Sequence, residues 1–266
     1  MQYQPALDGV RAWSVTAVLM FHGGVSWMSG GYLGVSTFFT LSGFLITSLL
    51  LREHSESGHI ARSAFYTRRA RRLLPASLVC IVGVALMAGA GWFAGVPHIR
   101  RDSYGALFQV FNWVKLGAGE SYADLTAVNA GLRKPLEHYW SLAIEEQFYW
   151  VWPVAFVGLM AFGRRVRRSP VVVIGALAAV FSVVAPVVAR VWGPDAAYWS
   201  TPARVSEILL GALAAAWVHQ RHSDGTPLRA GWSQAGTVAL AALIIACVLF
   251  PTGHGPAYQG ALPLVG

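Results

Sequence analysis

Two ionisable side chains flank an apolar run near the start of the chain, and their spacing could support acid–base chemistry. Arg11 begins the run and His22 lies near its end. On an α-helix this separation places them within about 20° of one face and roughly 16 Å apart, so Arg11 would lie at a membrane surface and His22 near the middle. A neutral imidazole can take the proton of an attacking hydroxyl. A packed core histidine and an arginine reaching the lipid headgroups would explain the same residues.

A polar stripe marks a later apolar stretch. Its members follow one another at steps of three, four and four and therefore share one helix face: His138, Ser141, Glu145 and Tyr149. Polar and ionisable groups inside a membrane are costly and usually functional. The stripe is a candidate site for an acceptor substrate. We prefer Glu145 to Glu146 as a catalytic group because only Glu145 shares the stripe.

Two further groups of charged residues admit both a functional and a structural reading. Four arginines precede the third apolar stretch, namely Arg68, Arg69, Arg71 and Arg72. On a helix three of them (68, 71 and 72) share a side, where their guanidinium groups could bind phosphate or anchor the chain to lipid. Arg204 and Glu207 are one helical turn apart and could form a structural ion pair or contact a substrate.

The elements that must position these groups are predicted to be membrane-spanning helices. Seven apolar stretches have nearly the required length, near 10–28, 33–51, 73–95, 138–162, 170–192, 203–219 and 232–250. They predict an all-α polytopic transmembrane helix bundle. Residues 104–116 are too short to cross and should be interfacial or re-entrant. The last apolar piece, 257–266, is also too short, so we expect an incomplete final helix.

Charge and composition set the orientation and exclude other classes. The chain of 266 residues is 55% hydrophobic and 12% charged, which excludes an ordinary soluble domain. Arginines cluster in alternate loops, including 52–72, so those loops and the N-terminus should be cytoplasmic. The net charge of +8 follows from these loops and does not indicate nucleic-acid binding. Cys80 and Cys247 lie inside apolar runs, which argues against a disulfide framework and a metal site.

Five stretches resemble, in the same order, motifs of the acyltransferase-3 family of integral-membrane O-acyltransferases. They are LDGVR followed by His22, then GYLGVSTFFTLSGFLIT, FYTRRARRLLP, HYWSLAIEEQFY and RVSEILLG. The resemblance implies a single membrane domain over 1–266, incomplete at its C-terminus, in a bacterial plasma membrane. The second motif, which contains Ser42, would line the path of the acyl donor beside His22.

The same resemblance implies a reaction. The four arginines would bind the phosphates of a cytoplasmic acyl-CoA, acetyl-CoA or another short one, as donor substrate, with no bound cofactor. The acceptor would be a hydroxyl of a carbohydrate, in an envelope polysaccharide or a glycosylated small molecule. His22 would act as general base, or carry the acyl group covalently, and Arg11 would position phosphates or stabilise developing negative charge.

Two other classes use similar residues. A transporter or flippase also needs intramembrane His, Arg and Glu, although no internal repeat is visible in the sequence. A non-catalytic membrane subunit is the third reading. Detecting labelled acyl groups on an acceptor would separate the enzyme from both.

Overall fold

The regular structure of the described chain is helical. The computed structural model describes residues 5–121, 134–226, 231–251 and 262–264, and within them there is no strand. The long helices are α1 (Pro5–His22), α2 (Leu33–Ser57), α3 (Arg62–Gly89), α7 (Tyr139–Arg165), α8 (Pro170–Trp192), α10 (Thr201–Ser223) and α11 (Gly231–Leu249). The short ones are α4 (Ile99–Leu107), α5 (Phe111–Gly117), α9 (Pro194–Trp199) and the 3-10 turn η2 (Leu262–Leu264).

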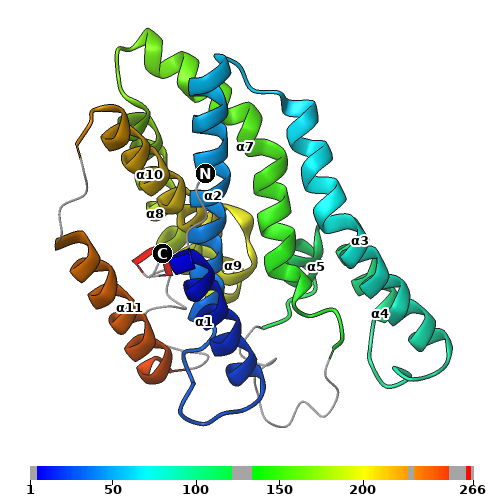
Figure 1. Cartoon of the computed structure of the whole chain (residues 1–266). Coiled ribbons are helices and arrows are strands. Elements are labelled where there is room, and N and C mark those ends of the chain that lie inside the picture. The colour runs from blue at the N-terminus through cyan, green and yellow to red at the C-terminus, as the bar shows by residue number, and fades with distance from the viewer. Residues whose placement is uncertain (1–4, 122–133, 227–230, 252–261, 265–266) are drawn as a thin grey trace.

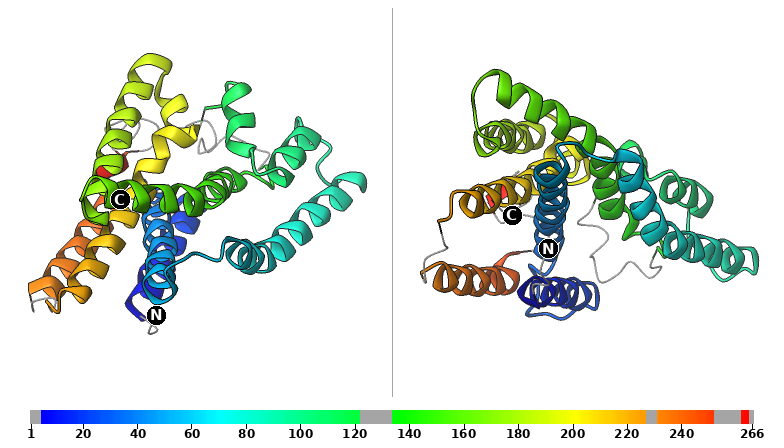
Figure 2. Two further views of the ribbon diagram at one scale, coloured as in Figure 1. Left: turned by 90° about the horizontal axis from the view of Figure 1, so that it is seen from above. Right: turned by 45° about the horizontal axis from the view of Figure 1, so that its top comes forward.

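Helix α2 forms the centre of the molecule. Figure 1 shows α3 and α7 to one side of it and α8, α10 and α11 to the other. In both views of Figure 2, α3 lies at the edge of the molecule, apart from α8 and α10. Helices α2 and α10 pack closely against each other, because glycines stand at their contact. A Cβ at Gly43 would overlap the Ile208 carbonyl oxygen, and one at Gly211 would overlap that of Thr40.

Each of the seven predicted stretches corresponds to a long helix, but α1 and α3 end at His22 and Gly89, before the predicted residues 28 and 95. The prediction of a helix through residue 28 is wrong, because α1 ends at His22. Gly23 and Gly24 follow, and Gly24 has a φ of 76°, a left-handed conformation that stops helices. His22 therefore lies at the C-terminal end of its helix, and its depth in the membrane stays a prediction.

Helix α3 begins earlier than predicted and includes the four arginines. It starts at Arg62, so the predicted linker 52–72 shrinks to a short connection after Ser57. Gly58 ends α2 with a φ of 71°. The Glu53 carboxylate accepts a hydrogen bond of 2.8 Å from the Ala61 N–H, which fixes this connection. The basic segment and the apolar segment are thus one continuous helix.

The segment predicted to be interfacial or re-entrant forms two short helices, α4 and α5. Neither is long enough to cross a bilayer. Gln109 lies between them with a φ of 55°. Helix α9, also short, was not predicted. Most of the predicted last piece, 257–266, lies outside the described residues.

Four described helices are long and apolar enough to cross a membrane. They are α2, α3, α8 and α11, and they indicate a membrane protein. Helices α1, α7 and α10 do not meet the same criterion, and these three contain Arg11, the polar stripe and the Arg204–Glu207 pair. Seven spans and a cytoplasmic N-terminus therefore stay predictions.

Candidate active site

A cavity of about 420 Å³ lies between α3 and α7. Hydrogen bonds join the two helices near both of its ends. At one end the Tyr66 hydroxyl donates to the Trp150 carbonyl oxygen over 2.7 Å, and at the other the Tyr139 hydroxyl donates to that of Ser77 over 3.0 Å. Since residue numbers rise along α3 as they fall along α7, the helices are antiparallel. The cavity wall on α3 extends from Tyr66 to Cys80, roughly 21 Å of helix.

Arg69 lies near the first end of this cavity. Its guanidinium carbon lies 3.6 Å from the centre of the Tyr149 ring, a close cation–π contact. Its charge also acts on Glu145 and Glu146. Arg69 and Arg72 line a second cavity as well, of about 470 Å³, between α2 and α3. The two cavities therefore share an arginine wall.

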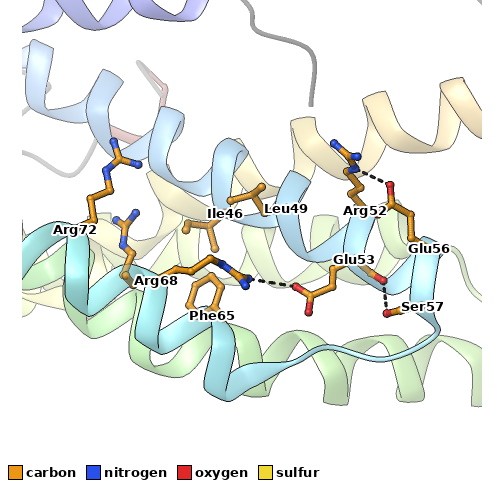
Figure 3. Close-up of a pocket in the computed structure, with 10 residues that line it drawn as sticks. Ile46, Leu49, Arg52, Glu53, Glu56, Ser57, Phe65, Arg68 and Arg72 are labelled. Atoms are coloured by element: carbon orange, nitrogen blue, oxygen red, sulfur yellow. Dashed lines mark hydrogen bonds and ion pairs between the residues drawn. The ribbon is translucent and has the colours of Figure 1, made fainter.

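The second cavity contains the basic cluster (Figure 3). Arg68 lies 3.7 Å from the Glu53 carboxylate, and Arg52 lies 2.6 Å from that of Glu56. Arg72 also lines this cavity. These cations are exposed or half-buried and suit polyanionic ligands such as phosphates. Arg52 was not among the predicted binding residues, although its position one turn before the end of α2 could have suggested it.

Arg71 lines neither cavity, unlike Arg68, Arg69 and Arg72, and binding of phosphate by all four arginines stays a prediction. Phe65 is buried and shows which face of α3 packs inward. Residues 68, 69 and 72 follow Phe65 by three, four and seven positions and share its face, whereas Arg71 points about 120° away. Arg71 is exposed and lines neither cavity.

The two adjacent glutamates of α7 have separate surroundings. Glu145 accepts a hydrogen bond of 3.0 Å from the Tyr149 hydroxyl, and Ser42 of α2 interacts with both. Glu146 lines the cavity between α3 and α7, whereas Glu145 does not. The predicted stripe is thus divided: His138 and Tyr149 line this cavity, and Ser141 does not. Ser42 interacts with Glu145 and Tyr149 and does not line the arginine-rich cavity.

His138 lies at the other end of the cavity, whereas His22 lines neither cavity. The charge of His22 acts on His138. His22 itself is exposed. Its Nδ1 lies 2.8 Å from the Val18 carbonyl oxygen. A carbonyl only accepts, so Nδ1 carries the hydrogen and Nε2 keeps a lone pair when the ring is neutral. That tautomer is the one that a base requires.

Arg11, Arg204 and Glu207 also line neither cavity. Arg11 lies in the second turn of α1, 3.7 Å from the Asp8 carboxylate and eleven residues before His22. Arg204 and Glu207 are completely buried and form an ion pair of 2.9 Å. Arg204 also lies over the rings of Phe39, Trp140 and Tyr198. This enclosure supports the structural reading of the pair, since it leaves little room for a substrate.

A buried cation holds the chain segment in front of His138. Lys115 of α5 is fully buried, and its ammonium lies 2.8 Å from Glu120, 2.9 Å from Glu137 and 3.5 Å from Asp102. Glu137 directly precedes His138 in the sequence, so this pairing fixes the start of α7. Among the described residues, no group of three or more His, Cys, Asp and Glu side chains could hold a metal ion.

Comparison with known proteins connects this geometry to a family. The acyltransferase domain of the acyltransferase-3 family matches residues 4–266. The chain is 34% identical to the peptidoglycan O-acetyltransferase OatA of Listeria monocytogenes over 99% of its own length and 42% of the relative. It is 34% identical to the putative peptidoglycan O-acetyltransferase YrhL of Bacillus subtilis, over 98% of this chain and 41% of that protein.

A shorter match has a higher identity. The chain is 41% identical to a putative O-acetyltransferase of Staphylococcus aureus over 60% of its own length and 26% of the relative. The chain therefore spans less than half the length of these relatives. No solved structure matches it. Because the family match extends over nearly all of its residues, this chain belongs to the acyltransferase-3 family.

Proposed function

We propose that this chain is the membrane part of an O-acyltransferase that moves an acyl group, acetyl in the first instance, from cytoplasmic acyl-CoA to a carbohydrate hydroxyl. Membership of the family supports the reaction class. The names of two relatives make peptidoglycan the first acceptor to test. The protein would be a multi-pass protein of a bacterial plasma membrane.

The observation that carries the proposal is the arginine wall shared by the two cavities. Arg69 and Arg72 line both the basic cavity and the cavity that continues to His138. Phosphates held among the arginines would leave the acyl arm of the donor to extend between α3 and α7. The thioester would then approach the histidine end.

His22 supplies the base in this proposal. Its Nε2 takes the proton of the acceptor hydroxyl while the hydroxyl oxygen attacks the thioester carbonyl carbon. The C–O bond forms, the C–S bond breaks, and the imidazolium returns the proton to the leaving thiolate, so that an ester and free coenzyme A result. A positioned base contributes typically about 10²- to 10⁴-fold to the rate.

The test measures transfer of label from radiolabelled acetyl-CoA in membranes that contain the full-length protein, with wild type beside His22→Ala. We expect label in the peptidoglycan or another envelope fraction for the wild type and its loss in the variant. The control is His222→Ala. His222 is also exposed near the end of a helix, and its Nδ1 lies 2.8 Å from the Val218 carbonyl oxygen, so it matches His22 in local structure but is far from the cavity.

Each other outcome has a meaning. Unchanged transfer in His22→Ala would remove His22 from the mechanism. Absence of any labelled acceptor from acetyl-CoA or longer acyl-CoA, with the protein present in the membrane, would contradict the enzyme and favour a transporter.

A further inference from the structure

Gln109 has an unusual backbone at the wall of the cavity between α3 and α7. It lies in the turn between α4 and α5 with a φ of 55°, in the left-handed region that residues other than glycine rarely adopt. It also lines the cavity. Such a conformation costs about 1 kcal/mol or more and persists only where the surroundings impose it.

Gln147 of α7 imposes this conformation. Its Nε2 donates to the Gln109 carbonyl oxygen over 2.8 Å and to Asn112 Oδ1 over 2.9 Å. Its Oε1 accepts from Trp113 Nε1 over 3.1 Å and from the Thr201 hydroxyl. All four hydrogen-bonding positions of the Gln147 amide are therefore used. The turn that presents Gln109 is held by α5, α7 and α10 together.

The Gln109 side chain, in contrast, has a free acceptor. Its Oε1 is buried and finds no hydrogen-bond partner in the described part of the chain. The same is true of Glu146 Oε1 and of the donor Arg69 Nε, and both of these residues line the same cavity. A buried polar atom without a partner costs about 1–3 kcal/mol. Three of them around one cavity indicate that a ligand supplies the missing partners.

The remaining wall narrows the chemistry of that ligand. It is largely apolar, with Leu73, Leu74 and Leu142. A heavily hydroxylated sugar would lose hydrogen bonds with water on entering, and this wall offers too few polar groups to replace them. Two acceptors and one donor match a chain of methylene groups interrupted by secondary amides. The amide N–H would satisfy Gln109 or Glu146, and its carbonyl would accept from Arg69.

We propose that Gln109 recognises the donor by accepting a hydrogen bond from a secondary amide N–H of its pantetheine arm. This inference depends on the proposed use of acyl-CoA. Gln109 would be a specificity residue: it contacts the arm of the donor and takes no part in proton transfer.

The experiment compares two acetyl thioesters in membranes that contain the full-length protein. S-acetyl-pantetheine carries two secondary amides, and the S-acetyl ester of butanethiol carries none. In Gln109→Met the side chain keeps its length and loses the acceptor. We expect kcat/KM for S-acetyl-pantetheine to fall about tenfold, within the range for one buried hydrogen bond, and kcat/KM for the butanethiol ester to stay unchanged.

A second variant guards against a folding defect. Gln109→Gly removes the acceptor and adopts a positive φ without penalty, so it should show the same loss of preference for the amide-containing thioester. An equal fall for both thioesters, or no fall for either, would overturn the role of Gln109. If the wild type uses neither thioester nor acetyl-CoA, the proposed function fails instead, and this recognition role with it.

Discussion

The guanidinium of Arg69 combines two contacts that a point charge could not make together. It lies over the Tyr149 ring at 3.6 Å and borders both cavities. A planar, delocalised cation stacks on an aromatic ring while its N–H groups bind phosphate, whereas a lysine ammonium offers neither the plane nor the fixed fork. Arg69 is therefore the arginine whose shape, and not only its charge, should matter.

The first prediction compares Arg69→Lys with Arg71→Lys. Both changes keep the charge. We expect Arg69→Lys to raise the KM for acetyl-CoA about tenfold, equivalent to about 1.4 kcal/mol, because the stacked contact and the forked N–H groups are lost. Arg71 is exposed and lines neither cavity, so Arg71→Lys should leave the KM unchanged.

The measurement is the initial rate of acetyl transfer in membranes as a function of acetyl-CoA concentration. A raised KM in Arg71→Lys and none in Arg69→Lys would support the grouping that we predicted from helical spacing alone. Helical spacing states which residues share a face and not which face packs inward, so it could not separate Arg71 from the other three arginines. Phe65 supplies that reference only once its burial is known.

The contact between α2 and α10 depends on two glycines in different helices. Gly43 approaches Ile208 and Gly211 approaches Thr40 so closely that neither position has room for a Cβ. The Thr40 hydroxyl also lies 3.2 Å from the Glu207 carbonyl oxygen across the same contact. Small residues of this kind let membrane helices approach, so that dispersion and hydrogen bonds act between backbones.

The second prediction concerns this contact. Gly211→Ala should destabilise the protein by about 1–3 kcal/mol or more, because the new methyl forces the two helices apart. Gly83→Ala, in α3, is the matched control: a Cβ added there would have no atom within 4 Å, and alanine favours a helix interior. Thermal unfolding in detergent should show a lower midpoint for Gly211→Ala and an equal or higher midpoint for Gly83→Ala. Equal midpoints for both variants would contradict the close contact.

The long helices were predictable because an apolar run of about twenty residues rarely adopts another structure. Their ends were not predictable, because a helix can stop or start within such a run where the local residues favour it. α1 stops at Gly23 although apolar residues follow, and α3 starts within a basic segment because arginine is a good helix former. Gln109 was not predictable at all, since its conformation is imposed by Gln147, which is distant in the sequence.

Some residues of the two cavities were predicted from the sequence, but their arrangement was not. The motifs identified His22, the arginines and the glutamates, but no sequence pattern states that α3 lies antiparallel to α7. The division between Glu145 and Glu146 follows from that placement, since Glu146 lines the cavity and Glu145 contacts Tyr149.

The third prediction concerns the orientation of the whole chain. If the end of α2 and the basic first turns of α3 are cytoplasmic, Ser55→Cys, near the end of α2, should react with a membrane-impermeant maleimide only after cells are opened. Ser26→Cys, in the turn after α1, should react in intact cells. Both positions are exposed. Labelling should be measured in a background that lacks Cys80 and Cys247, and the reverse pattern would contradict the predicted orientation.

The last prediction is the response of the molecule to acid, which depends on the charges gathered outside the membrane-spanning segments. Lys115, Lys134 and Arg101 surround the Glu120 carboxylate. Their hydrogen bonds outweigh the effect of burial and lower the pKa of Glu120 from 4.5 to about 2. Glu120 therefore contributes stability above about pH 4.5, up to about 3 kcal/mol, and loses it as the pH falls towards 2.

Glu137 provides the contrast. It contacts the same Lys115, but its pKa shifts in the opposite direction from that of Glu120. Burial raises the pKa of Glu137 above 4.5 despite that lysine, so protonation of Glu137 relieves a cost in the folded state and does not cause acid unfolding. In detergent, Glu120→Gln should flatten the fall of the unfolding midpoint between about pH 4.5 and pH 2, while Glu137→Gln should leave that fall in place. A steep fall that persists in Glu120→Gln would contradict the role of Glu120.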